Sequence, residues 1–392
     1  MSISGVIAEF NPLHLGHQHI LNHAKQNENT VICAISGNFV QRGDTAVISK
    51  FKRAEAALRC GADIVCEIPV LWSMSTAQNF ALGAVSQLIN LGCDEIVFGS
   101  ECGNIDEIIK ASEILNHNDF SSVLSEELAK GITFAVAREN AAKRLGYSGD
   151  AFSTPNDTLG IEYITAAKIL GFKGTFRCIK RIGAEHDSEI INPNGVSASL
   201  IREKLRMGDI GFAERFMPSN LRGFLNKDML SDISRIENAI LTVLRLRTKE
   251  ELSHLPDLSE GLENKLFFSI RVATSLDELC TMIKTKRYSY ARIRRLVLSA
   301  FLGFDNEFFK EIPPYTRVLG FSEMGQKHLG TVIEGDIPIV TRASEIKLLD
   351  EKSIKVFEAE CRATDLFSLS LSTPQECGAE YKAKFLKTEC LK

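Results

Sequence analysis

Short apolar runs alternate with helical patterns through the first half of the chain. Five runs read as buried strands, at residues 6–8, 31–35, 64–68, 95–98 and 175–179. Helical spacing of apolar positions separates them, most clearly over residues 50–60 and 77–91 and again from about residue 105. Strands that alternate with helices predict an α/β fold, in which helices cover both faces of a doubly wound, mostly parallel sheet.

The pattern changes after about residue 210. Residues 221–246, 260–284 and 290–301 carry helical spacing, and the pair Pro313-Pro314 ends this run. We therefore expect two domains, a Rossmann-like α/β domain over residues 1–210 and a mainly helical domain over residues 211–392.

The charge balance gives no global attraction to nucleic acid. The 392 residues carry a formal net charge of −4, so RNA binding needs a local basic patch and DNA binding is not expected. No long uncharged apolar segment and no charged-then-apolar leader is present, which predicts a cytoplasmic protein without a membrane span. The ten cysteines include no C-x-x-C pair, which favours reduced thiols and no metal site. The oligomeric state stays open.

The segment from Ile7 to Ile20 joins the first predicted strand to the first predicted helix. His14 and His17 flank Gly16 at this junction, and both face one ligand if they lie in the first helical turn. Backbone N–H groups and the helix dipole make such a terminus a natural anion site, and Gly16 leaves room for a nucleotide. The alternative is a pair of ordinary, partly buried histidines in a turn.

Further candidates for phosphate contacts follow other predicted strands or open other helices. They are Lys50, Gly99, Gly103, Asn156, Lys180, Arg181, Ser197, Ser199 and Arg202. In the Ser-x-Ser-x-x-Arg spacing, a serine starts a helix and Arg202 lies one turn beyond Ser199. Hydroxyls, N–H groups and a guanidinium all bind a triphosphate.

Each of these candidates has an ordinary alternative. Lys50 also fits a solvated helix face, the two glycines fit a turn, and the Ser-Arg element fits a capped surface helix. Asn156 and Asp157 read as the N-cap region of a helix that runs through residue 166. Since capping needs one of them, the other has a polar group left for a ligand.

A basic stripe lies in the helical half of the chain. It comprises Lys284, Lys286, Arg287, Arg292, Arg294 and Arg295, with Tyr288 and Tyr290 between them. Lysine and arginine hold RNA phosphates, and tyrosines stack on unpaired bases. The alternative is a solvated helix face.

The motifs resemble a known family. The His-x-Gly-His arrangement is similar to the signature of the nucleotidylyltransferase superfamily. Blocks over residues 8–17, 61–69, 155–163, 180–184, 287–294 and 317–323 resemble the bacterial tRNA(Met) cytidine acetate ligases. These blocks are spread over nearly the whole chain, so the resemblance is more specific than the histidine motif alone.

The resemblance implies a two-step reaction. ATP and acetate form acetyl-adenylate, and the N4 amine of the wobble cytidine of elongator tRNA(Met) then takes the acetyl group. It implies charge stabilisation at the α-phosphate by His14 and His17, and Mg²⁺ held mainly through phosphates. From the residues themselves we add Lys50 to the catalytic set and assign RNA contacts to the basic stripe. The resemblance also implies ATP contacts by Gly99 or Gly103, Asn156, Lys180, Arg181 and the segment Ile7, Ala8, Glu9, Phe10, Asn11, Pro12, Leu13, His14, Leu15, Gly16, His17, Gln18, His19 and Ile20.

Two other functions stay open at this point. One is a transferase of the same superfamily that passes an adenylyl or cytidylyl group to a small phosphorylated acceptor and makes a cofactor. The basic helical half argues against it, because a small acceptor needs no such surface. The other is a non-catalytic RNA-binding protein with a vestigial nucleotide site, against which the intact His14, Gly16 and His17 argue.

Overall fold

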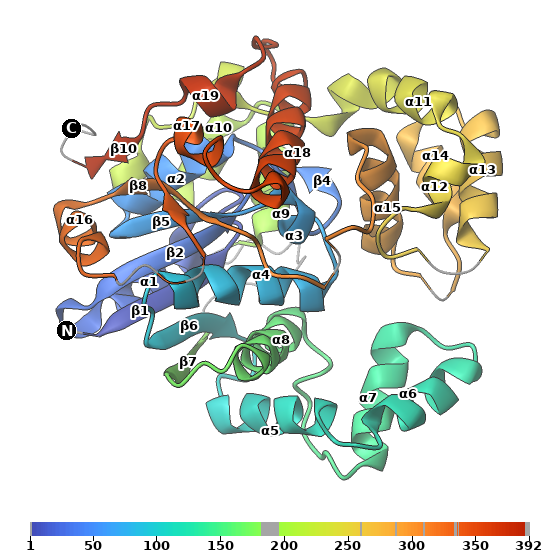
Figure 1. Ribbon diagram of the computed structural model, residues 1–392, viewed down its shortest axis with the longest axis horizontal. Coiled ribbons are helices and arrows are strands. Elements are labelled where there is room, and N and C mark those ends of the chain that lie inside the picture. The colour runs from blue at the N-terminus through green and yellow to red at the C-terminus, as the bar shows by residue number, and fades with distance from the viewer. Residues whose placement is uncertain are drawn as a thin grey trace.

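The computed structural model describes residues 2–181, 196–258, 261–286, 288–308, 310–332, 335 and 337–388 (Figure 1). Its main sheet has the strand order β10-β8-β5-β2-β1-β6-β7, with β9 beside β8. Five of these strands are parallel and match the five predicted runs. They are β1 (Ile3–Ala8), β2 (Thr30–Ser36), β5 (Ile64–Ile68), β6 (Glu95–Ser100) and β7 (Thr175–Lys180).

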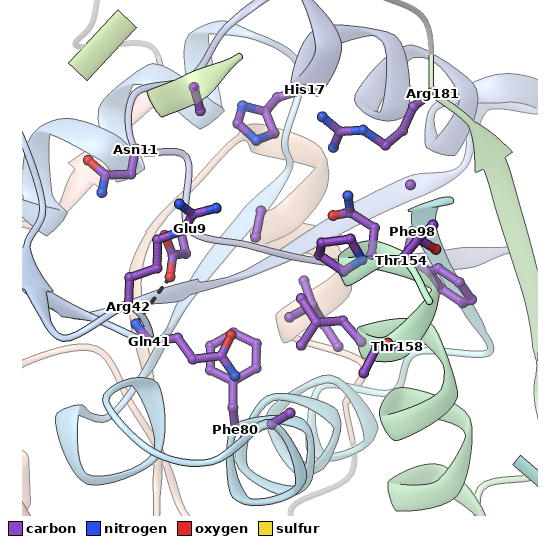
Figure 2. Close-up of a pocket in the computed structure, with 18 of the residues that line it drawn as sticks. Glu9, Asn11, His17, Gln41, Arg42, Phe80, Phe98, Thr154, Thr158 and Arg181 are labelled. Atoms are coloured by element: carbon purple, nitrogen blue, oxygen red, sulfur yellow. Dashed lines mark hydrogen bonds between the residues drawn. The ribbon is translucent and has the colours of Figure 1, made fainter. Parts of the chain in front are cut away.

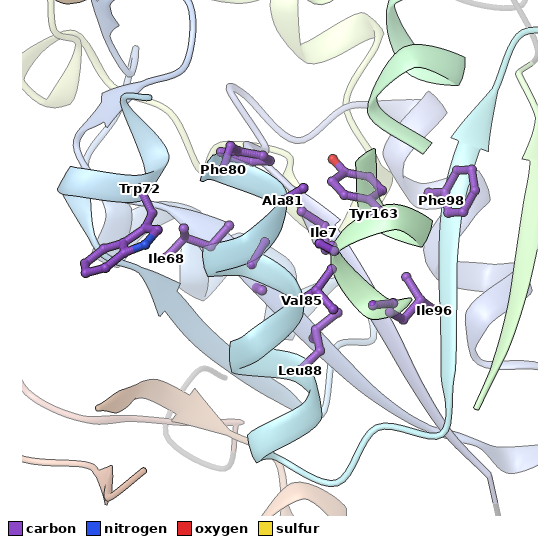
Figure 3. Packing of buried hydrophobic residues seen from close by; sticks show 14 of the residues in the cluster. Ile7, Ile68, Trp72, Phe80, Ala81, Val85, Leu88, Ile96, Phe98 and Tyr163 are labelled. Carbon is purple, nitrogen blue, oxygen red and sulfur yellow. The ribbon is translucent and has the colours of Figure 1, made fainter. Parts of the chain in front are cut away.

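Alternating side chains of the parallel strands pack into two cores, one on each face of the sheet. Ile7 and Ile32 face one core, whereas Val6 and Cys33 face the other, because successive residues of a strand point to opposite sides. The first core receives α4 (Ala77–Asn90) and α8 (Pro155–Ile169), as Figure 3 shows for α4. The second core receives α1 (Leu15–Ala24), α2 (Lys50–Arg59), α9 (Ala198–Arg206) and α10 (Ile210–Arg215). The predicted doubly wound α/β class is thus confirmed.

Two helical parts extend from these layers, the first of them joined to the first core through α5 (Ile105–Leu115). This first part is an insertion between β6 and α8 that contains α5, α6 (Phe120–Ala129) and α7 (Phe134–Arg144). The second part has its own apolar core and contains α11 (Glu237–Leu246), α12 (Lys249–Ser253), α13 (Leu262–Val272), α14 (Leu276–Ile283) and α15 (Tyr290–Leu302). The α6–α7 pair and this second part lie on the same side of the sheet domain in Figure 1.

The last part of the chain returns to the sheet, which corrects the predicted domain division. β8 (Thr316–Phe321) pairs antiparallel with β5, and β10 (Leu386–Lys387) pairs with β8. Residues of α10 also pack on the sheet rather than on the helical part. A mainly helical domain over residues 211–392 is therefore wrong at both of its ends, and the helical part spans α11 to α15. Sequence periodicity missed this because β8 pairs with a strand about 250 residues earlier.

The long helix α18 (Glu351–Ser368) and several short elements complete the described structure. The short elements are β3 (Phe39–Val40), β4 (Asp44–Thr45), α3 (Val70–Ser73), α16 (Glu323–Leu329), β9 (Ile339–Val340), α17 (Ala343–Ile346) and α19 (Ala379–Lys382), with 3-10 turns at 26–28, 219–221, 227–229 and 233–236. Among the described helices, none is long and apolar enough to cross a bilayer. No group of three His, Cys, Asp or Glu side chains suited to a metal ion occurs in the same residues.

Candidate active site

A cavity of about 580 Å³ opens at the carboxyl ends of β1 and β6 (Figure 2). The chain leaves β1 for β2 on one side and reaches β6 on the other, so the cavity lies at the switch point of the sheet. The first turns of α1, α4, α8 and α9 line it. N–H groups and helix dipoles at such turns favour an anionic ligand.

The two histidines form the cap of α1. His14 is the N-cap residue, and its Nδ1 accepts the N–H of Gly16 at 3.0 Å. Nδ1 of His17 accepts the N–H of His14 at 3.4 Å, and the two ring centroids are 4.0 Å apart. Because both Nδ1 atoms accept, each neutral ring carries its hydrogen on Nε2. Both rings line the cavity, as the first-turn prediction required.

The surroundings keep both rings uncharged. Burial, together with the nearby Arg181 and Arg202, lowers the pKa of His14 to about 3. Burial, His14 and the same two arginines also lower the pKa of His17 well below its ordinary value. At neutral pH the histidines therefore act as neutral N–H donors, and the arginines supply the positive charge.

The Ser-Arg element reaches the cavity from α9. Ser197 is the N-cap and accepts the N–H of Leu200 at 3.2 Å. Arg202 donates from Nη1 to the carbonyl of Asn11 at 2.9 Å and from Nη2 to Oγ of Ser199 at 3.3 Å. The residues that lead into α1 and the first turn of α9 thus form one polar wall of the cavity. Arg42 and Arg181 extend this wall.

Of the candidates near β6 and α8, Gly99 and Asn156 line the cavity, whereas Gly103 and Lys180 do not. Gly99 lines the cavity, and a Cβ there would come within 3.0 Å of Ile20. Gly103 has a positive φ of 68° and packs on Lys180, so it forms a turn behind the cavity. Asn156 lines the cavity and donates from Nδ2 to Glu101 at 2.5 Å. Lys180 is exposed and borders a smaller space of about 30 Å³ on the far side of the histidines.

The helix N-cap near Asn156 differs from the prediction. Thr154 is the N-cap residue and Pro155 the first residue of α8. Asp157 instead accepts the hydroxyl of Ser100 at 2.5 Å and the N–H groups of Glu101 and Cys102 at 3.0 Å. Asp157 therefore holds the loop after β6, and Asn156 is left to face the cavity.

Part of the 7–20 segment faces away from the cavity. Its lining members are Ile7, Ala8, Glu9, Phe10, Asn11, His14, His17 and Ile20. Leu13 belongs to the apolar core, and Gln18 donates to the carbonyl of Cys60 at 3.0 Å. Leu15, Gly16 and His19 border the smaller space, and Pro12 is buried without lining either.

Lys50 is not part of the cavity, which corrects its assignment to phosphate. Its side chain is completely buried, and Nζ contacts Glu67, Glu360 at 2.7 Å and Glu380 at 2.6 Å. Arg317 joins the same cluster through Glu380 and Glu67. A lysine held by three buried carboxylates stabilises the fold and cannot reach a nucleotide.

The basic stripe is only partly available to RNA. Arg294 donates to the carbonyl of Gly43 at 2.7 Å, and Arg295 to that of Gln41 at 3.0 Å. These two arginines fasten α15 to the 41–43 loop, which corrects their assignment as surface contacts for RNA. Arg292 donates to the carbonyl of Asp257 at 2.8 Å and lies over the Tyr288 ring.

The remaining stripe residues edge a second cavity. Lys284 and Lys286 are exposed there, and Arg287 lies outside the described residues. This cavity has a volume of about 1460 Å³ and lies between α7 and the α14–α15 pair. We call it the basic groove, and its described charged lining consists of Arg138, Lys284, Lys286, Arg292, Arg295, Lys310 and Asp257. Ala77, Ala135, Phe152, Thr158 and Arg295 line both spaces, so the cavity and the groove adjoin at these residues, which we call the doorway.

Sequence reasoning missed the apolar wall of the first cavity. Phe80, Phe98, Phe152 and Tyr163 line it, and each is less than a tenth exposed. Their spacing is that of core residues, and all four also pack in the first core, in which Figure 3 labels Phe80, Phe98 and Tyr163. No local signal separates a core aromatic from one that also faces a ligand. Gln41 and Arg42, which belong to a polar loop after β2, also line the cavity.

Comparisons with known proteins agree with this geometry. The model of the HIGH Nucleotidyl Transferase family matches residues 1–382. The tRNA(Met) cytidine acetate ligase of Thermoanaerobacter sp. is 36% identical over 403 residues, which cover 99% of this chain and 100% of that protein. The protein of the same name from Clostridium perfringens is 35% identical over 388 residues, covering 94% and 95%.

Solved structures give the same relationship. Thermotoga maritima TmcAL in its apo form is 31% identical, with a TM-score of 0.92 and 99% of both chains covered. The same protein bound with alpha-thio ATP gives a TM-score of 0.89 at the same identity and coverage. The chain therefore belongs to the HIGH nucleotidyl transferases and, among them, to the tRNA(Met) cytidine acetate ligase family.

Proposed function

We propose that this chain activates acetate with ATP and transfers the acetyl group to N4 of the wobble cytidine in elongator tRNA(Met). The observation that carries the proposal is the doorway, because a cavity suited to an anion adjoins a basic groove there. Relatives named tRNA(Met) cytidine acetate ligase cover the whole chain, and TmcAL binds alpha-thio ATP. A function on tRNA would be exercised in the cytoplasm.

In the first step, a carboxylate oxygen of acetate attacks the α-phosphorus of ATP and pyrophosphate leaves. His14 and His17, which line the cavity, would donate Nε2–H groups to the phosphates, and Arg181 and Arg202 would balance the charge that builds up. Since the residues hold donors in fixed positions, positioning and charge stabilisation supply most of the rate.

Mg²⁺ fits this cavity only as a companion of ATP. The described residues contain no cluster of three metal-ligating side chains, and Glu9 is the one carboxylate among those that line the cavity. Mg²⁺ commonly keeps several waters and binds through substrate phosphates, where it neutralises their charge.

In the second step, the wobble base reaches the cavity through the doorway. Lys284 and Lys286 at the groove would hold backbone phosphates, and Tyr288 offers a ring for stacking. A wobble base already lies in a single-stranded loop, so its extrusion costs little unstacking energy.

The test is incorporation of labelled acetate into RNA. Purified protein is incubated with ATP, Mg²⁺, ¹⁴C-acetate and total bacterial tRNA, and the RNA is digested to nucleosides. Label in N4-acetylcytidine that requires ATP and disappears in His17→Ala is the expected result. ATP consumption only with small phosphorylated acceptors would favour the cofactor-forming transferase, and no ATP turnover would favour the RNA-binding protein.

A further inference from the structure

The transfer step needs a group that accepts a proton. When the N4 amine of cytidine attacks an acyl-adenylate, the nitrogen becomes positively charged and must lose a hydrogen before AMP leaves. Among the described residues that line the cavity, the ionisable side chains are Glu9, His14, His17, Arg42, Tyr163, Arg181, Arg202 and Arg295. Glu9 is the one carboxylate in this set.

The other groups are poor acceptors. Nδ1 of each histidine is occupied by a backbone N–H, and Nε2 carries the hydrogen. Burial and the two arginines also lower the pKa of His14 to about 3. Burial raises the pKa of Tyr163, which keeps its phenol protonated. Glu9 is therefore the acceptor that the lining supplies.

Glu9 lies between the polar wall of the cavity and the doorway. Oε1 of Glu9 accepts the N–H of Gln41 at 3.1 Å, and the carbonyl of Gln41 accepts Nη1 of Arg295 at 3.0 Å. Arg295 lines both the cavity and the groove. On the other side, Arg202 binds the carbonyl of Asn11, two residues beyond Glu9. Figure 2 shows Glu9 beside Gln41 and Arg42 and across the cavity from Thr154 and Thr158.

The charge of Glu9 opposes the anions of the substrates, although it attracts the nearby Arg53 and Arg202. A carboxylate beside a triphosphate and an acetate raises the energy of both bound anions. None of the ion pairs formed between described residues includes Glu9. Because this carboxylate disfavours the binding of anions, we expect it to have a role in the reaction.

We propose that Glu9 is the general base of acetyl transfer, an inference that rests on the proposed function and deepens it. The N4 lone pair forms a bond to the acetyl carbonyl carbon, and the carbonyl π electrons move to oxygen. The Glu9 carboxylate takes one N4 hydrogen. The tetrahedral intermediate then re-forms the carbonyl, the bond between carbon and the adenylate oxygen breaks, and AMP leaves with that electron pair. Glu9 returns its proton to water.

The test measures the two half-reactions separately in the full-length chain. Acetate-dependent exchange of labelled pyrophosphate into ATP reports activation, and single-turnover transfer from acetyl-adenylate to tRNA(Met) reports the second step. Glu9→Gln keeps an oxygen that accepts the Gln41 N–H but removes the base. We expect it to lower transfer at least 100-fold more than exchange.

Two further variants sharpen the result. Glu9→Asp keeps the charge on a shorter side chain and should recover part of the transfer rate. Glu55→Gln is the matched control, because Glu55 is a largely buried carboxylate paired with Arg59 outside the cavity. It should leave the ratio of the two rates at the wild-type value.

Other outcomes overturn the inference in distinct ways. If Glu9→Gln lowers exchange and transfer equally, Glu9 serves ATP binding or its cation. If transfer falls less than threefold, Glu9 is not the base. If the wild-type chain itself exchanges no pyrophosphate with acetate, the proposed function fails before Glu9 is tested.

Discussion

Two clusters of charged side chains lie against the same sheet, and they have opposite roles. In the open cluster, Arg181 and Arg202 face a cavity and form no ion pair with a carboxylate of the described residues. In the sealed cluster, Lys50 and Arg317 are surrounded by Glu67, Glu360 and Glu380. A cation near the end of a strand is thus available to a ligand only where no carboxylate from another part of the chain packs against it.

The sealed cluster closes the C-terminal part of the chain onto the sheet domain. Glu360 comes from α18 and Glu380 from α19, whereas Lys50 opens α2. Burial and the Glu360 carboxylate raise the pKa of Glu67. Lys50 and Arg317 contact these carboxylates, and the buried Arg53 lies near enough to interact with Glu67 and Glu360, so that charges of both signs offset one another inside the fold.

The largest expected effect comes from breaking the sealed cluster. Lys50→Met should lower the free energy of unfolding by about 3–5 kcal/mol, because it leaves buried carboxylates without their central cation. Urea denaturation measures this change. Arg202→Met, made in the open cluster, should cost about 1 kcal/mol or less. A Lys50→Met chain with wild-type stability and weakened ATP binding would reverse the roles of the two clusters.

Removing a donor from the open cluster should affect activity instead. His17→Ala should lower acetate-dependent pyrophosphate exchange by about 10²–10³-fold, since one hydrogen-bond donor to the reacting phosphate is lost. His23→Ala is the matched control, because His23 lies on α1 outside the cavity and stacks on His19. Exchange within threefold of wild type in His17→Ala would rule out this role.

The lowered histidine pKa makes the open cluster sensitive to acid. His14 has a pKa of about 3 in the folded chain and about 6.5 when unfolded, so the unfolded state binds more protons between these values. The contribution of the neutral His14 ring to the free energy of unfolding is present above pH 6.5, and it is lost as the pH falls toward 3. Lowering the pH from 7 to 5 should therefore cost the wild type about 2 kcal/mol more than His14→Gln. Urea denaturation at both pH values measures it, and equal losses would contradict the assigned protonation.

The smallest expected effect lies in the basic groove. Lys284→Ala combined with Lys286→Ala should weaken tRNA binding by about three- to tenfold and reduce the salt slope by about 1–2. Filter binding across salt concentrations measures both quantities. Lys227→Ala with Lys249→Ala removes two exposed lysines elsewhere and serves as the control. Equal effects of the two pairs would show that the groove has no special part in RNA binding.

Sequence reasoning succeeded where the deciding contacts are local. Each parallel strand was predicted to within three residues, and the cap formed by His14, Gly16 and His17 depends on neighbours only. The Ser197 cap accepts the N–H of Leu200 three residues later, and Arg202 donates to Ser199 three residues earlier. Such short-range geometry follows directly from residue type and spacing.

It failed where the partner is distant in sequence. The carboxylates that seal Lys50 include one 310 residues later, and Arg294 is held by a carbonyl 251 residues earlier. Phe80 and Phe98 carry the periodicity of core residues, which says nothing of the cavity on their other side. The tertiary fold, rather than the local pattern, decides which charged and aromatic residues a ligand can reach.

The most direct test of the open cluster is pyrophosphate exchange by the wild-type chain without RNA. The account predicts exchange into ATP that requires acetate, because the cavity alone carries the phosphate donors of His14, His17 and Arg202. Formation of acetylated cytidine with no exchange under any condition, or exchange that is independent of acetate, would contradict it.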